Sequence, residues 1–150
     1  MVQKMDFSIR PATKNDAAKI RWLIYRAGIN PFGLKWPRFV IAAGDDGQFL
    51  GCAQLKPHGD GSIELASLAV EEHFRGKGIA RALIEHLLTD CPRPLYLTCR
   101  AELGPLYQRF GFRSVGMSDA LSPRYHRLRK IFDIFHRLQG RERGLIMRLD

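Results

Sequence analysis

The chain has 150 residues, a formal net charge of +9 and an apolar content of 45%. This length suggests one domain, and the apolar content is too high for a disordered chain. Apolar runs stay short of the roughly 18 residues of a membrane span, and residues 1–10 lack the apolar segment of a signal peptide. The positive charge favours an anionic ligand, an acidic substrate or a nucleic acid.

The cysteines Cys52, Cys91 and Cys99 lie in or beside apolar segments. Their spacing matches neither a metal site nor a redox motif, so no metal is expected. They are typical of reduced cysteines in a cytoplasmic protein. Because no histidine lies beside them at a motif spacing, a cysteine nucleophile is not indicated.

Apolar residues that alternate or run between turn residues predict strands, and apolar residues three and four apart predict helices. In chain order we expect strands at 7–10, 39–43, 49–55, 63–70, 95–99, 113–117 and 145–149, and helices at 17–27, 79–88 and 104–111. The strands from 39 to 70 form an antiparallel meander, and 95–99 follows 63–70 in parallel through the intervening helix. The predicted fold class is α/β, with a mixed, mostly antiparallel sheet flanked by helices.

An extra segment, Ser118 to Arg143, separates the last two predicted strands. It contains a basic amphipathic helix, whose apolar face comprises Leu128, Ile131, Phe132, Phe135 and Leu138. We expect a surface helix that packs over the sheet. A lid over an acceptor site, a dimer contact and a docking surface for an acidic partner are the alternatives.

The loop from Phe74 to Ala80 lies between a predicted strand and a predicted helix. This arrangement aims backbone N–H groups at an anion. Arg75 and Lys77 favour a phosphate or pyrophosphate as that anion. A Walker loop is excluded because Gly78 follows the Gly-Lys pair, and a Rossmann fingerprint is excluded because Arg81 replaces the third small residue.

The motif Arg-x-x-Gly-x-Ala at 75–80 resembles the coenzyme A loop of the GNAT superfamily of N-acetyltransferases. A second segment, Leu106 to Phe112, is similar to that family's Leu-Tyr-x-x-x-Gly-Phe landmark and follows in the family's order. The resemblance covers about Phe7 to Met117 and Gly144 to Asp150. It implies a single N-acetyltransferase domain (1–150) with a GNAT-like sheet, in which 118–143 is a basic helical insertion between the last two strands.

The resemblance also implies that the two parallel strands splay and that acetyl-CoA binds between them, after Val70 and Cys99. The implied coenzyme-binding residues are Leu68, Ala69, Val70, Arg75, Gly76, Lys77, Gly78, Ile79, Ala80 and Arg100. Backbone groups at 68–70 would pair with the pantetheine arm and polarise the thioester carbonyl. Arg100 stands where many members carry an asparagine, so it contacts the coenzyme or acceptor differently, or that contact is absent.

Two residues are the catalytic candidates. Glu64 is the only acidic residue in the run 63–70, and its position is similar to that of the catalytic glutamate in the histone-acetyltransferase branch of the family. As general base it would take the proton of the amine; the alternative is a solvent-facing glutamate. His58 and His73 are weaker candidates because they lie in polar turns. Tyr107 matches the tyrosine that protonates the departing thiolate; the alternative is a core aromatic.

The resemblance implies direct acetyl transfer to a primary amine, and the run Glu64 to Val70 is also similar to the acetyltransferase domain of N-acetylglutamate synthases. In the family the acceptor binds at loops that correspond to Asn30–Arg38 and Ser118–Arg143, whose charge favours an amino acid or a small molecule with a carboxylate or phosphate. A protein or peptide acceptor is one alternative. A non-catalytic module that binds nucleic acid or a partner is another. A homodimer is left open, and neither nucleic acid nor a membrane is expected as partner.

Overall fold

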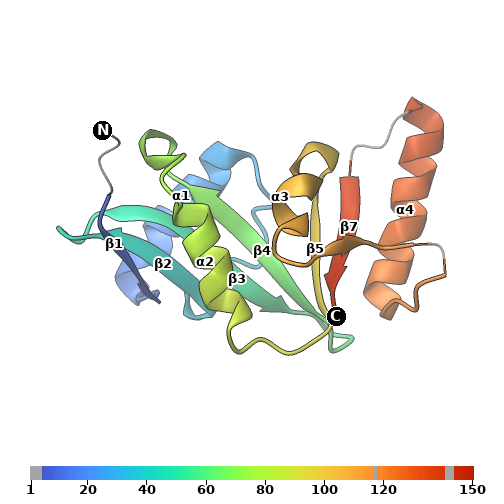
Figure 1. Cartoon of the computed structure of the whole chain (residues 1–150), viewed down its shortest axis with the longest axis horizontal. Coiled ribbons are helices and arrows are strands. Elements are labelled where there is room, and N and C mark those ends of the chain that lie inside the picture. Colours follow the sequence, from blue (N-terminus) through green and yellow to red (C-terminus); the bar gives the residue numbers. More distant parts are fainter. Residues whose placement is uncertain (1–4, 117, 141–143) are drawn as a thin grey trace. The chain divides into compact units, whose positions relative to one another are not determined.

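The computed structural model describes residues 5–116, 118–140 and 144–150. Within these ranges the sheet has seven strands, in the order β1-β2-β3-β4-β5-β7-β6. The strands are β1 (Phe7–Pro11), β2 (Phe39–Gly44), β3 (Phe49–Pro57), β4 (Ile63–Val70), β5 (Leu95–Arg100), β6 (Arg113–Ser114) and β7 (Gly144–Leu149). The helices are α1 (Ala17–Ala27), α2 (Ile79–Leu88), α3 (Gly104–Gln108) and α4 (Pro123–Gln139) (Figure 1).

The pairing of the strands confirms the predicted fold class. Strands β1, β2 and β3 pair antiparallel, as β7 does with β5 and β6. Strands β4 and β5 are parallel, and their pairs join Ile63 with Leu95 and Glu64 with Tyr96. Strand β6 is shorter than predicted because the side chain of Asp119 accepts the N–H of Gly116 and turns the chain there. Met117, the predicted end of that strand, lies outside the described residues.

The chain forms two compact units. The first comprises Met1–Lys56 and Leu65–Cys91, and the second comprises Pro57–Glu64 and Pro92–Asp150. Strand β4 belongs to both, since its first two residues lie in the second unit. The expectation of one domain stays a prediction.

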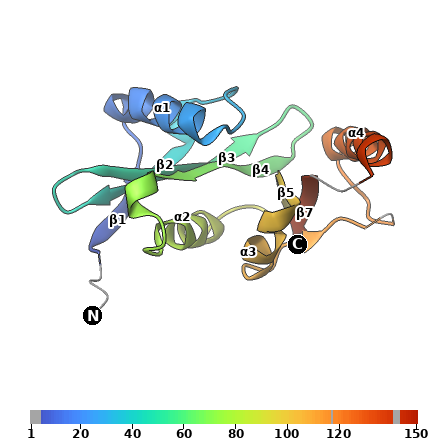
Figure 2. The ribbon, with the colours of Figure 1, turned by 90° about the horizontal axis from the view of Figure 1, so that it is seen from above.

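In the first unit, α1 and α2 cover opposite faces of the sheet (Figure 2). Helix α1 buries Ile20, Leu23 and Ile24 in a core that includes Phe39 and Cys52. Helix α2 buries one apolar face, which consists of Ile79, Leu83, Ile84 and Leu87. Burial of both sheet faces explains why β2 and β3 read as continuous apolar runs.

In the second unit, α3 and α4 pack against opposite faces of β7, because successive residues of a strand point to opposite sides. Leu145 lies so close to Gly104 at the start of α3 that a Cβ on this glycine would meet it at 2.9 Å. The next residue, Ile146, packs with Tyr96 of β5 and Tyr125 of α4. This second core holds α4 through residues of its first three turns.

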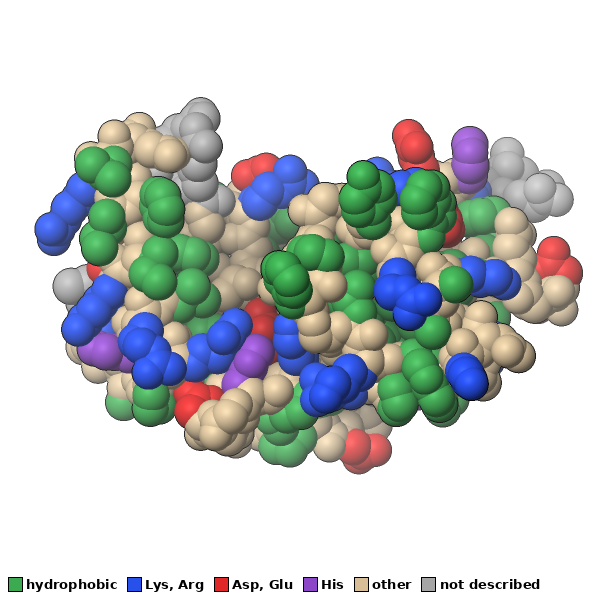
Figure 3. Space-filling view, turned by 180° about the vertical axis from the view of Figure 1, so that it is seen from behind, with side chains coloured by type: hydrophobic (Ala, Val, Ile, Leu, Met, Phe, Trp, Pro, Cys, Tyr) green, Lys and Arg blue, Asp and Glu red, His purple; other side chains and the backbone are tan. Residues whose placement is uncertain are grey.

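The predicted apolar face of α4 is divided in the structure. Leu128 and Phe132 pack against the second core. The remaining three predicted residues are exposed, and together with Ile134 they form an outer stripe that is 47–77% exposed and comprises Ile131, Ile134, Phe135 and Leu138. Around α4, hydrophobic side chains lie beside Lys and Arg side chains (Figure 3). Periodicity predicted the helix but could not tell which part of a wide apolar arc is covered. The end of the predicted insertion, 141–143, lies outside the described residues.

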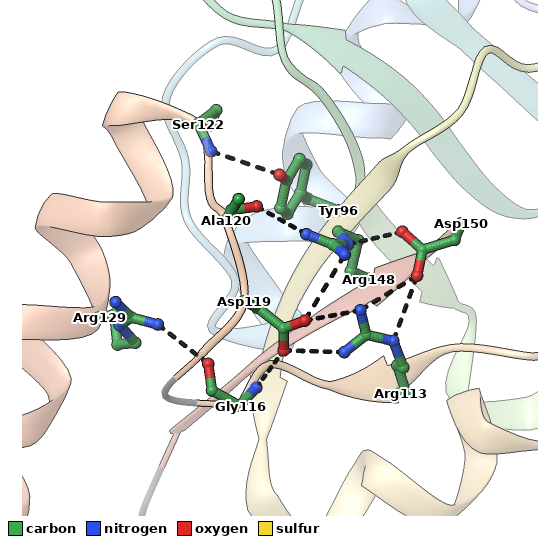
Figure 4. Close-up of polar contacts among 9 residues, drawn as sticks. All are labelled: Tyr96, Arg113, Gly116, Asp119, Ala120, Ser122, Arg129, Arg148 and Asp150. Carbon is green, nitrogen blue, oxygen red and sulfur yellow. Dashed lines mark hydrogen bonds and ion pairs between the residues drawn. The ribbon is translucent and has the colours of Figure 1, made fainter.

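Polar contacts fasten the segment that leads into α4 (Figure 4). Arg113 donates two hydrogen bonds of 2.9 Å to the carboxylate of Asp119, and Arg148 donates one of 2.8 Å to the carbonyl of Ala120. The Ser122 N–H donates to the Tyr96 hydroxyl at 3.4 Å. The Arg113 guanidinium holds the pKa of Asp119 at about 2. The start of α4 is therefore tied to β5, β6 and β7.

Candidate active site

The loop between β4 and α2 presents backbone donors that no side chain of the described residues uses. Gly76 and Gly78 have φ angles of 78° and 82°, and a Cβ at either position would meet nothing within 4 Å. The Ala82 N–H donates to Gly78 O, so the N–H groups of the residues between them point out of the helix start. Within the described part of the chain no side chain caps α2. The helix dipole adds partial positive charge there, so this loop can bind an anion.

The structure brings the predicted loop residues 75–80 together at the start of α2. Arg75 and Lys77 are exposed. The Nε of Arg75 donates to the carbonyl oxygen of Val70 at 3.3 Å, which ties the loop to the end of β4. Arg75 therefore has a second role that the motif did not indicate: it fixes the loop.

Strand β4 is distorted before the predicted carbonyl-polarising residues 68–70. Ser67 has a φ of 57°, in the left-handed region. Its hydroxyl accepts a hydrogen bond of 2.8 Å from Nε2 of the buried Gln54. A left-handed residue within a strand re-aims the peptide groups that follow it, here those of Leu68 and Ala69. The sequence signal was a serine inside an apolar strand, which pattern reading passed over.

Glu64 is buried and hydrogen-bonded. It is 8% exposed, so the alternative of a solvent-facing glutamate is wrong. Its Oε1 lies 2.8 Å from Nε2 of His58, and Thr98 Oγ1 donates to its Oε2 at 3.4 Å. The sequence makes His58 a weaker candidate because it lies in a polar turn, but that turn folds back beside Glu64. His73 is exposed.

Helix α4 contributes two further groups to this cluster. Arg124 Nη2 lies 3.9 Å from Glu64 Oε1, which is beyond hydrogen-bond distance. Tyr125 is fully buried and stacks on Tyr96 with ring centroids 4.1 Å apart. Arg124 Nε and the Tyr125 hydroxyl are buried without a hydrogen bond of standard geometry to any described residue. Burial raises the pKa of Tyr125 well above its usual range, so it stays protonated.

Asp60 fixes the first turn of α4. Its Oδ2 accepts the backbone N–H of Arg124 at 2.9 Å, and its Oδ1 accepts the Ser62 hydroxyl. These hydrogen bonds, that of Ser62 above all, hold the pKa of Asp60 far below its usual range. We call Glu64, His58, Arg124 and Tyr125 the Glu64 cluster. Two of its members come from the segment that the resemblance did not cover.

Tyr107 is nearly buried on α3 and packs edge-on against Phe112 at a centroid distance of 6.1 Å. Burial, with a smaller effect of Cys99, raises the pKa of Tyr107 to about 12. The hydroxyl therefore carries its proton at neutral pH. Both sequence interpretations, a core aromatic and a proton donor, agree with this position.

Arg100 ends β5, with its side chain 75% exposed and an ion pair of 3.6 Å to Glu102. A role in coenzyme binding stays a prediction. In the ranges that the structure describes, no group of three His, Cys, Asp or Glu residues could hold a metal ion. No helix in those ranges combines the length and hydropathy needed to cross a bilayer.

The sequence model of the acetyltransferase (GNAT) family matches residues 5–112, which is more than half of the chain. The chain belongs to the GNAT family. The resemblance inferred from the two motifs is thereby confirmed. A curated relative, N-acetylaspartate synthetase of Rattus norvegicus, is 33% identical over 82 residues, which cover 49% of this chain and 27% of the relative. The human N-acetylaspartate synthetase matches to the same extent. The chain thus spans about a quarter of the length of these relatives.

Solved structures show the same GNAT fold. The N-acetylglutamate synthase of Neisseria gonorrhoeae, complexed with coenzyme A and N-acetylglutamate, has a TM-score of 0.69 at 22% identity, over 99% of this chain and 36% of that one. A Mycobacterium tuberculosis protein complexed with coenzyme A gives 0.70 at 18% identity, over 95% and 98%. The ribosomal-protein-S18-alanine N-acetyltransferase of Escherichia coli gives 0.67 at 20% identity, over 96% and 93%.

Proposed function

We propose that this GNAT chain transfers the acetyl group of acetyl-CoA to the primary amine of an amino acid or another small molecule. The observation that carries the proposal is the free helix start at Gly78, in a loop that lies within the matched family region. A pyrophosphate would accept hydrogen bonds from the N–H groups of this loop and interact with Arg75 and Lys77. The peptide groups of 68–70 would hold the pantetheine arm.

Glu64 is the proposed general base. An amine with a pKa near 10.4, the reference for a lysine-like group, is mostly an ammonium at neutral pH and must lose a proton before it attacks. The buried Glu64 carboxylate can accept that proton, and His58, 2.8 Å away, can share it. The free amine then forms the C–N bond at the thioester carbonyl as the C–S bond breaks.

Tyr107 is the proposed general acid. The departing thiolate needs a proton, and a phenol with a pKa of about 12 still holds one at neutral pH. Leaving-group protonation of this kind contributes typically ~10²- to 10⁴-fold to a rate. No covalent enzyme intermediate is needed, because base and acid act on the two partners of one displacement.

The proposed acceptor class follows from the cluster charges and the relatives. The second unit places Arg124 beside Glu64, and relatives of this chain are named for N-acetylated aspartate and glutamate. The net charge of +9 opposes a lysine-rich peptide. An amino-acid amine therefore fits better than a basic protein tail.

Calorimetric titration with acetyl-CoA tests the coenzyme half of the proposal. The double variant Arg75→Ala/Lys77→Ala should lose affinity by about 10-fold or more, because two phosphate-pairing cations are removed. The matched control Lys14→Ala/Arg21→Ala, which removes two exposed cations elsewhere in the first unit, should bind as the wild type does. NADH should not bind.

Turnover assays test the acetyl-transfer half of the proposal. They measure the release of free thiol with acidic, neutral and basic amines as acceptors. The proposal expects an amino acid among the best acceptors. No saturable binding at millimolar acetyl-CoA would overturn the proposal, and so would the absence of turnover with every amine. Salt-sensitive oligonucleotide binding in that case would support the nucleic-acid alternative.

A further inference from the structure

Two opposite charges of the Glu64 cluster form an ion pair that is too long for a hydrogen bond. Arg124 Nη2 and Glu64 Oε1 are 3.9 Å apart, whereas a charge-assisted hydrogen bond between such groups is about 2.7–2.9 Å long. Arg124 Nε is buried and makes no hydrogen bond of standard geometry to a described residue. The Tyr125 hydroxyl interacts with this guanidinium, and the guanidinium keeps donors that Glu64 does not use.

A second polar group in the cluster lacks a hydrogen bond of standard geometry to a described residue. The Tyr125 hydroxyl is buried in a fully buried side chain and lacks a well-aligned partner among the described residues. Buried polar groups of this kind are rare in folded proteins, and the interaction of this hydroxyl with Arg124 does not meet standard hydrogen-bond geometry. Both groups belong to consecutive residues at the start of α4, next to Glu64, which pairs with His58.

We infer that Glu64 and Arg124 form a binding site for the amine and the α-carboxylate of an α-amino acid. Its amine would lie against the Glu64 carboxylate, and its α-carboxylate would accept hydrogen bonds from the Arg124 guanidinium. This inference rests on the proposed function, in which Glu64 deprotonates the acceptor. It assigns Arg124, from the α4 segment, as the residue that selects a free carboxylate.

The separation of the two charges selects α-amino acids in particular. The amine and the carboxylate of an α-amino acid are attached to the same carbon, so their binding partners must be neighbours. Glu64 and Arg124 meet this condition at 3.9 Å. A lysine side chain in a peptide, an alkylamine and an amino-acid amide offer the amine without the carboxylate, so none of them would supply an anion to Arg124.

The helix start that carries Arg124 in this binding site is held in place before any ligand binds. Asp60 holds the backbone N–H of Arg124 at 2.9 Å, and Tyr96 holds both the Tyr125 ring by stacking and the N–H of Ser122. The contacts of Asp119 and Arg148 fasten the preceding segment (Figure 4). Ordering the arginine in advance lowers the entropy lost when an anion binds.

Steady-state kinetics of Arg124→Gln test the inference. The acceptors are the amino acid that the wild type uses best and the amide of the same amino acid. Arg124→Gln should raise KM for the amino acid by about 10- to 100-fold, the range of a lost hydrogen bond to a charged group, and should change KM for the amide by less than about 3-fold. Arg124→Lys should restore part of the affinity for the acid. Arg127→Gln, which removes an exposed charge from the same helix, is the matched control.

Each outcome has a distinct meaning. An equal loss for acid and amide, carried by kcat, would overturn the inference, because Arg124 would then act through Glu64. A wild type that uses the amide as well as the acid would also overturn it while leaving the acetyltransferase activity in place. A wild type that turns over no amine would overturn the proposed function and this inference with it. Circular dichroism melting shows whether Arg124→Gln is folded, and Arg124→Lys supplies the test if it is not.

Discussion

Nε2 of His58 lies 2.8 Å from Oε1 of Glu64, and both side chains are about nine-tenths buried. The pair joins a turn to the first residues of β4 and shields the carboxylate from bulk water. Thr98 and Arg124 approach the same carboxylate from β5 and α4. A base held from three directions keeps one orientation, which general-base catalysis requires.

Glu64→Gln removes the base and keeps the shape of the side chain. We expect kcat to fall by ~10²- to 10⁴-fold, the usual contribution of a positioned base, with the affinity for acetyl-CoA unchanged. Glu85→Gln, the same change on the exposed surface of α2, should have no effect. Discontinuous assays of thiol release measure kcat for both variants. Retention of more than half of the wild-type kcat in Glu64→Gln would remove Glu64 from the mechanism.

His58→Gln should lower kcat by about 10-fold, because Glu64 keeps its carboxylate but loses the partner that shares the proton. The double variant with Glu64→Gln should be no worse than Glu64→Gln alone, since residues that act as a unit are strongly non-additive. The kcat values of the wild type, the two single variants and the double variant together give a double-mutant cycle. Additive losses would show that the two residues act separately.

Tyr107→Phe should lower kcat by ~10²-fold with little change in KM, because the thiolate leaves without its proton donor. Its pKa of about 12 also predicts a stability effect in alkali. The folded state holds this proton more tightly than the unfolded state, whose pKa is about 10. The stabilisation is complete below pH 10 and is lost as the pH rises through 12. Denaturant melts from pH 9 to 12 should show a smaller alkaline loss in Tyr107→Phe than in the wild type.

Gly78→Ala tests the free helix start. The φ of 82° is costly for any residue with a Cβ, so the free energy of unfolding should fall by about 1–2 kcal/mol. The new methyl group also fills the space that a phosphate would use. Gly140→Ala places the same strain at the end of α4, where φ is 69°, and should lose similar stability without any change in acetyl-CoA affinity. Equal affinities in both variants would contradict the anion-binding role of the loop.

Asp16 predicts how the fold responds to acid. Its carboxylate accepts two hydrogen bonds from Arg10 and one from the N–H of Thr13, and the Arg10 hydrogen bonds above all hold its pKa at about 2. A lowered pKa stabilises the fold above about pH 4, the unfolded value, and this stabilisation is lost as the pH falls through 2. Asp16→Asn should cost about 2 kcal/mol at pH 7, and the difference from the wild type should shrink from pH 4 to pH 2. Asp45→Asn, in an exposed turn, is the control.

Local signals were strong enough to predict much of the framework. The apolar run 63–70 and the spacing of 79–88 matched β4 and α2 at both ends, because turn residues and glycines bound them on each side. The loop 75–80 could be placed between β4 and α2 because its glycines bound the helix, and its role in anion binding stays a prediction. Strand β6 was overestimated because the turn at Gly116 depends on a side chain, Asp119, that follows it.

Distant contacts were beyond the reach of the sequence pattern. His58 meets Glu64 only because the intervening turn closes with hydrogen bonds between His58 and the residues Gly61 and Ser62. Arg124 reaches the same carboxylate through the docking of α4, and nothing in its own neighbourhood of charged residues distinguishes it from Arg127 or Arg129. The sequence shows Ser67 only as a serine within an apolar strand, and its left-handed conformation depends on a hydrogen bond from Gln54 of the adjacent strand.

The exposed stripe on α4 leaves this helix with two sets of positions under different constraints. The side chains of Tyr125, Leu128 and Phe132 pack in the second core, so substitutions at these positions would disturb the packing. The side chains of Ile134 and Leu138 are exposed, so packing within the chain does not constrain these positions. Replacing Ile134 and Leu138 by glutamine or lysine would reduce the apolar surface of the chain without changing its core. Such a variant would suit concentrated samples and crystal growth. The same two sites are also natural attachment points for a fluorophore or spin label.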